Sequence, residues 1–267
     1  MRFSLLFLMF SLVACVTKPG TENIEQLRNL NTTTVISNSD GVSSIRLQAL
    51  QDTAMTIGAQ SGLANHAKQL NVTLEKKATY LDQVFNFHAL LLPHGVLPPI
   101  LAEGREEFNL AADDSIRVSD RVYKIISQAH FVSTPPNWRD YLYLSYTSPD
   151  FPDRTLLPQS RKERAIWQKY VTLGWNEGAR QCDAIFEQNL ARLKRDFSGM
   201  VLYRQLLAQN MVSPPFVAKA SLGVTGGGSE LRVNDQVLRI TAMPSLQSNT
   251  KRWKPALQKE GPGMAPN

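Results

Sequence analysis

The chain has 267 residues, a formal net charge of +6 and two cysteines, and 43% of its residues are hydrophobic. This length and apolar content suffice for an ordinary soluble core, arranged as one large domain or two small ones. No stretch after the N-terminal one reaches the ~20 apolar residues of a transmembrane helix, which excludes an integral helical membrane protein.

The first fourteen residues have the pattern of a secretory signal, with Arg2 before a short apolar run and the small residue Ala14 at its end. The following residue, Cys15, completes a Leu-Val-Ala-Cys sequence that resembles the bacterial lipobox. That resemblance implies cleavage before Cys15 and attachment of a diacylglycerol to its thiol. Val16 replaces the Asp that often retains lipoproteins in the inner membrane, so we expect a lipid anchor on the periplasmic face of the outer membrane. The alternative is an ordinary secretory signal with a chance cysteine.

The N-terminal part of the mature chain predicts a tether followed by helices. Residues 15–44 are rich in Thr, Asn and Ser without a hydrophobic period, which predicts an acylated N-terminus and a flexible tether. From Ile45, apolar residues recur at helical spacing to residue 74, and a second helix is expected over 75–91. We expect residues 45–245 to form a mostly helical periplasmic domain and residues 246–267 a loosely ordered tail.

The middle of the chain contains the strongest helical signal. Residues 100–132 partly alternate, so they predict either a strand pair or a strand entering a helix. Apolar residues then keep helical spacing from Ser160 to Met211, and the glycines in this stretch are expected to bend or divide the helix. Glu163 follows Ser160 by three residues, which predicts a helix capping box.

The C-terminal part predicts a hairpin. Two short apolar runs flank Asn234 and Asp235, as two strands around a tight turn would, and Val224–Ser229 reads as a flexible turn. The predicted fold class is therefore mainly α with a small β-hairpin element near the C-terminus (α+β), preceded by a flexible N-terminal tether.

The sequence shows no recognisable catalytic, phosphate-binding or metal-binding motif. The four histidines are far apart and form no local metal site, and no phosphate loop or nucleophile elbow is present. Adjacent acids such as Glu106 and Glu107 are typical of solvated or capping positions, and Cys182 of a small buried side chain. We therefore expect no enzymatic activity, no cofactor and no metal. In the periplasm, a basic chain favours anionic lipid, peptidoglycan or an acidic protein over nucleic acid.

Several longer sequence motifs resemble the DotC lipoprotein family of type IVB (Dot/Icm-type) secretion systems and IncI-type conjugation machineries. These motifs lie in colinear order between about residues 45 and 255, and the lipobox precedes them. They are Val96-Leu97-Pro98-Pro99, Pro135-Pro136-Asn137-Trp138-Arg139-Asp140-Tyr141-Leu142, Asn189 to Asp196, Leu206 to Ser213, Leu222 to Gly226 and Leu238-Arg239-Ile240-Thr241.

This resemblance implies an outer-membrane lipoprotein that is a structural subunit of a secretion or conjugation core complex. Its partners would be a small DotD-like lipoprotein and a DotH-like subunit, which it would help to place at the outer membrane within a ring-shaped hetero-oligomer. The resemblance transfers one functional residue, the acylated Cys15, and no enzymatic activity or cofactor. Two alternatives remain: a periplasmic envelope hydrolase acting on peptidoglycan, and a periplasmic ligand-binding lipoprotein.

Overall fold

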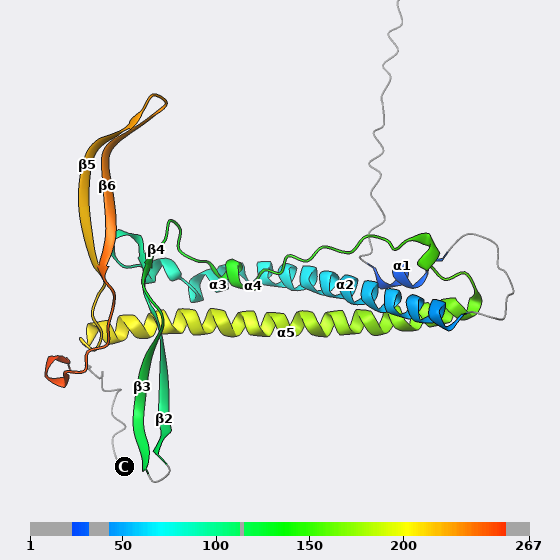
Figure 1. Ribbon diagram of the computed structural model, residues 1–267, viewed down its shortest axis with the longest axis horizontal. Coiled ribbons are helices and arrows are strands. Elements are labelled where there is room, and N and C mark those ends of the chain that lie inside the picture. The colour runs from blue at the N-terminus through cyan, green and yellow to red at the C-terminus, as the bar shows by residue number, and fades with distance from the viewer. Residues whose placement is uncertain (1–22, 32–42, 113–114, 255–267) are drawn as a thin grey trace, which may run out of the picture. The chain divides into compact units, whose positions relative to one another are not determined.

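The computed structural model describes residues 23–31, 43–112 and 115–254 (Figure 1). Residues 1–22, which include the predicted signal and Cys15, and residues 255–267 lie outside the described part of the chain. The chain divides into two compact units, one formed by Met1–Thr73 with Leu144–Ile185 and the other by Leu74–Tyr143 with Phe186–Asn267. Two long helices, α2 (Ser44–Lys76) and α5 (Arg161–Ala208), contribute residues to both units.

In the first unit, the N-terminal parts of α2 and α5 run parallel at very short distance. A Cβ added at Gly62 would lie 2.3 Å from the Trp175 carbonyl oxygen, and one at Gly178 would lie 2.0 Å from the Ala59 carbonyl oxygen. Only glycine permits this backbone approach, because any larger side chain would separate the helices. The glycines of α5 therefore mark close packing, and the expected bend or division of the helix is wrong: α5 is one helix of 48 residues.

The predicted tether contains an ordered segment. Helix α1 (Ile24–Arg28) is capped by Asn23, whose side chain accepts a hydrogen bond from the Glu25 N–H. Leu27 is fully buried in the core of the first unit, and its carbonyl oxygen accepts a 2.8 Å hydrogen bond from Trp167 Nε1. The expectation of a flexible tether is therefore wrong for residues 23–31; the rest of the range, apart from residues 43 and 44, lies outside the described residues.

The second unit begins with short helices around an aromatic core. Helix α3 (Ala78–Val84) ends earlier than the helix expected over 75–91, and two 3₁₀ turns, η1 (Phe87–Leu90) and η2 (Pro93–Gly95), follow it. The short strands β1 (Val96–Leu97) and β4 (His130–Phe131) pair with each other. Helix α4 (Trp138–Leu142) has a full capping box, and its Trp138 and Leu142 are buried against the C-terminal part of α5.

Residues 100–132 form a strand pair, which resolves the two alternatives left by the sequence. Strands β2 (Ile100–Ala112) and β3 (Ser115–Ser127) are antiparallel and pair only with each other among the described strands. At its base this pair packs beside α5, where a Cβ on Gly199 would lie 2.6 Å from the Leu101 carbonyl oxygen.

A second hairpin follows α5. Strands β5 (Phe216–Gly227) and β6 (Glu230–Ala242) pair along their whole length, and Val217 with its partner Ile240 packs against the core of this unit. The hairpin begins well before the predicted residues 231–241 and turns at residues 228–229. Asn234 lies within β6 with a positive φ of +58°, beside Gly223 at +76°, so the predicted turn is a mid-strand irregularity.

The segment after the hairpin is held at the end of α5. The Gln247 N–H donates to the Met211 carbonyl oxygen at 2.8 Å, and the Lys254 N–H donates to the Gln209 carbonyl oxygen at 2.8 Å. The 3₁₀ turn η4 (Thr250–Arg252) lies between them. Residues 246–254, which we expected to be loosely ordered, therefore have a defined position.

The predicted fold class is confirmed: the structure is mainly α with a C-terminal β-hairpin. In the first unit η3 (Arg154–Leu156) completes the connection into α5. None of the described helices is long and apolar enough to cross a membrane.

Candidate functional site

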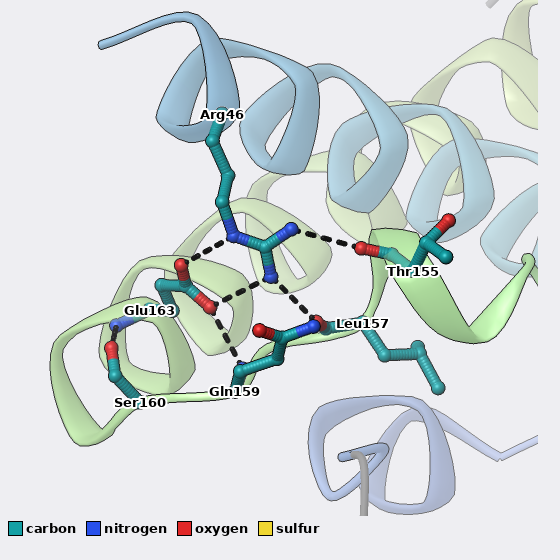
Figure 2. A network of polar contacts seen from close by, with 6 residues as sticks. All are labelled: Arg46, Thr155, Leu157, Gln159, Ser160 and Glu163. Atoms are coloured by element: carbon teal, nitrogen blue, oxygen red, sulfur yellow. Dashed lines mark hydrogen bonds and ion pairs between the residues drawn. The ribbon is translucent and has the colours of Figure 1, made fainter. Parts of the chain in front are cut away.

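A polar network lies in the first unit, where the first turns of α2 and α5 meet (Figure 2). Arg46 Nε donates to Glu163 Oε1 at 2.7 Å, and Arg46 Nη2 donates to Glu163 Oε2 at 3.1 Å. The same guanidinium also donates to the carbonyl oxygens of Thr155 and Leu157 at 2.9 and 3.3 Å. Arg46 thus joins α2 to α5 and to the segment that leads into α5.

Glu163 is the buried partner in this network, with 3% of its surface exposed. Its backbone N–H donates to Ser160 Oγ at 3.2 Å, which confirms the predicted cap, and its Oε2 accepts a 2.7 Å bond from the Gln159 N–H. Burial alone would raise the pKa of Glu163, but the hydrogen bonds from Arg46 and from the backbone hold that pKa below its usual range. The carboxylate is therefore kept ionised, which suits an anchor and not a general acid.

A small cavity of about 420 Å³ lies beside this network. It is lined mainly by the apolar parts of the first turns of α2 and of η3: Ser43, Ile45, Arg46, Ala49, Leu50, Thr155 and Leu156. The guanidinium of Arg46 is the one charged group in this lining, and its hydrogen bonds to Glu163 and to two carbonyl oxygens are already made. The lining thus offers no pair of titratable groups for acid–base chemistry.

A second polar cluster surrounds α4 in the other unit. Trp138 is fully buried, and its Nε1 donates to Asp82 Oδ1 at 2.7 Å. Arg139 lies over the Trp138 ring at 4.3 Å and forms ion pairs with Glu75 and Asp82 at 3.3 and 3.1 Å. Trp138, which the sequence singled out only through the family resemblance, lies in the core of this unit.

Tyr141 extends this cluster to α5. Its hydroxyl donates to Asp196 Oδ2 at 3.2 Å, and its ring stacks on Phe87. Burial and the neighbouring Asp196 carboxylate raise the pKa of Tyr141 to about 12, so the phenol stays protonated and a donor at physiological pH. The residues of the motif at 135–142 thus pack α4 against α3 and α5.

The carboxylate of Asp153 and the thiol of Cys182 have structural roles. Asp153 accepts hydrogen bonds from the Thr155 N–H and Oγ1 at the start of η3, and these bonds lower its pKa. Cys182 is fully buried, and burial raises the pKa of its thiol, which makes it unreactive. Across the described residues, no three His, Cys, Asp or Glu side chains are grouped so as to hold a metal ion.

The feature of the structure most suited to binding is the distal part of the β5–β6 hairpin, which the sequence did not identify as a site. Val224 pairs with Val233 and Gly226 with Leu231 across the two strands, and we call the exposed Val224, Leu231 and Val233 the hairpin patch. These three side chains are 64–70% exposed.

Other large apolar side chains along the hairpin are also exposed, namely Phe216, Leu222 and Val237. An isolated two-stranded sheet is marginally stable in water, and exposed apolar patches on it are typical of interaction sites. The alternation of apolar residues in Phe216–Val224 is the sequence signal that could have identified this exposed strand.

A family model described as type IV secretory system, conjugal DNA–protein transfer, matches residues 44–255 of the chain. The matched region includes residues of both units and the hairpin patch. No curated protein matches the chain.

Proposed function

This chain belongs to the type IV secretory family of conjugal DNA–protein transfer, and from that membership we propose that it is a structural, non-enzymatic subunit of a secretion or conjugation core complex. In this proposal the mature chain is an outer-membrane lipoprotein, anchored by the lipid on Cys15 and facing the periplasm. Its partners are DotH-like and DotD-like subunits, and it helps to position the DotH-like subunit at the outer membrane within a ring-shaped hetero-oligomer.

The hairpin patch is the observation that supports a structural role. The well-formed polar clusters, Arg46–Glu163 and Trp138–Arg139–Asp82, hold the chain's own helices together. The binding of partner subunits is therefore left to the exposed apolar surface. An exposed, two-stranded apolar hairpin is suited to burial in a larger assembly. The lipobox resemblance at Cys15 supports the anchoring part of the proposal.

The anchor is tested by Cys15→Ser in the native host. We expect the variant to be lost from outer-membrane fractions and recovered in soluble periplasm, with secretion or conjugation strongly reduced. The reason is that a serine hydroxyl is not acylated, so the attraction of about 0.8 kcal/mol per buried methylene disappears. Membrane fractionation with immunoblotting, together with a transfer assay, provides the measurement.

Cys182→Ser is the matched control, because it removes the other cysteine from a buried site far from the lipobox in sequence. It should remain in outer-membrane fractions. Retention of the Cys15→Ser variant in those fractions with normal secretion would contradict the anchoring proposal.

A further inference from the structure

The two strands of the β5–β6 hairpin have unequal outer edges. Strand β6 carries four charged side chains, Glu230, Arg232, Asp235 and Arg239, whereas β5 carries Lys219 alone in twelve residues. Charged side chains are how proteins protect exposed strand edges from pairing with other chains. The β5 edge has little charge protection and register irregularities only at Phe216/Val217 and between Ser221 and Val224, and no other described strand pairs with it.

The hairpin also carries two cations without a counter-charge. Glu230 forms an ion pair with Arg232 at 2.8 Å, and Asp235 accepts a hydrogen bond from Thr225. Lys219 and Arg239 form no ion pair with any described residue. Lys219 pairs with Leu238 and Arg239 pairs with Ala218, so the two cations occupy adjacent positions along the hairpin and their side chains lie on opposite faces of it. A partner that lies along this part of the hairpin would therefore need carboxylates.

A second copy of the same hairpin does not meet this need along the β5 edge. Strand β5 contains no Asp or Glu, so a β5–β5 pairing would leave Lys219 without a counter-charge. The whole chain is also basic, with a net charge of +6. Charge complementarity therefore favours a different, acidic protein over self-association.

We infer that β5 is the docking edge for an extended segment of another subunit, which adds to the hairpin as a third strand. The segment has apolar side chains that pack against the exposed Phe216, Leu222 and Val224, and carboxylates that reach Lys219 on one face of the hairpin and Arg239 on the other. Main-chain hydrogen bonds along β5 supply the attachment, and the apolar and acidic side chains select the partner. This inference rests on the proposed role in a secretion complex.

Hydrogen–deuterium exchange tests the pairing directly. The assembled complex, extracted from the native envelope in mild detergent, is compared with the purified full-length chain in the same detergent. We expect peptides from β5 to lose deuterium uptake in the complex, because their outward N–H groups gain partners, while peptides from β6 change little. Greater protection of β6 than of β5 would overturn the inference. So would protection of β5 that rises with the concentration of the purified chain alone, because it indicates a second copy.

The charge requirement is tested by the double variant Lys219→Glu/Arg239→Glu, with Lys219→Arg/Arg239→Lys as the matched control. Both positions are exposed, so we expect the circular dichroism and thermal unfolding of each variant to match the unsubstituted chain. The reversed variant should recover at least about tenfold less of the subunit that protects β5, and the conservative variant should recover the normal amount. Normal recovery with the reversed variant would overturn the acidic-partner inference.

Failure of this inference can be separated from failure of the proposed function. If the unsubstituted chain co-purifies with other secretion subunits but β5 exchange is unchanged, only the docking edge is wrong. If the unsubstituted chain elutes alone, the proposed membership of a core complex is itself contradicted.

Discussion

At the scale of single residues, the most consequential contact is the one between Arg46 and Glu163. Glu163 is almost completely buried, so removal of the guanidinium leaves a carboxylate in a site that water does not reach. We expect Arg46→Ala to lower the free energy of unfolding by about 3 kcal/mol, near the low end for breaking a buried pair, because Arg46 itself is partly exposed. Urea denaturation of the mature chain at neutral pH measures this loss.

The same contact predicts a pH dependence of stability. The pKa of Glu163 is lower in the folded chain than the value of about 4.3 expected for an unfolded chain. The carboxylate therefore contributes stability that is complete above the unfolded pKa and is lost as the pH falls through the folded pKa. We expect the free energy of unfolding to decline below about pH 4.5, and Glu163→Gln to remove part of that decline.

Denaturation series between neutral and acidic pH provide the measurement, and the exposed Glu230→Gln is the matched control. A Glu163→Gln variant whose stability declines with acid as steeply as that of the unsubstituted chain would show that Glu163 does not govern this range.

At the scale of secondary-structure elements, the parallel packing of α2 and α5 depends on glycines. An added Cβ at Gly178 would overlap the Ala59 carbonyl oxygen, and the backbone cannot yield as a flexible side chain could. The helix propensity of alanine favours the substitution by about 1 kcal/mol, but the overlap costs more. We expect Gly178→Ala to destabilise the chain by about 2 kcal/mol in thermal unfolding.

The control for this substitution is Gly228→Ala in the hairpin turn, where an added Cβ meets no atom within 4 Å. Its stability should change by less than about 0.5 kcal/mol. Equal stability of the Gly178→Ala variant and the unsubstituted chain would mean that the helices can separate without cost.

The sequence pattern predicted the positions of helices and strands better than it predicted the contacts between them. The period of apolar residues located α2 and α5, and the Ser160–Glu163 spacing located the start of α5, because these signals are local. The role of Gly178 depends on a helix more than a hundred residues away in sequence, so its local reading as a bend was wrong. Asn234 has the left-handed backbone typical of a turn, but the register with β5 makes it part of a strand.

The candidate site was less predictable than the fold. Trp138 is fully buried, and its Nε1 donates to Asp82, which lies far from it in sequence. The sequence predicted Val233 as a strand residue and Val224 as part of a flexible turn, whereas both lie in paired strands. Their exposure follows from the absence of a third element over the distal hairpin in the described structure, which a local pattern does not encode.

At the scale of the whole molecule, the structural proposal competes with a peptidoglycan hydrolase. Glycoside hydrolysis needs two carboxylates about 5–9 Å apart with separated pKa values. The buried carboxylates of Glu163 and Asp196 are instead each bound to an arginine, with distances of 2.7 Å. We therefore expect no clearing when the purified mature protein is assayed by peptidoglycan zymography, with lysozyme as the positive control. Clearing would favour the hydrolase.

The closure at the base of the β5–β6 hairpin has a mechanical consequence. Ser213 and Ser245 are joined where the two strands leave α5, with the Ser213 N–H donating to the Ser245 carbonyl oxygen at 2.9 Å. The bonds from Gln247 and Lys254 then tie the returning chain to the last residues of the helix region. A force that pulls on the hairpin therefore acts on these hydrogen bonds, so the two strands and the end of the helix region share the load.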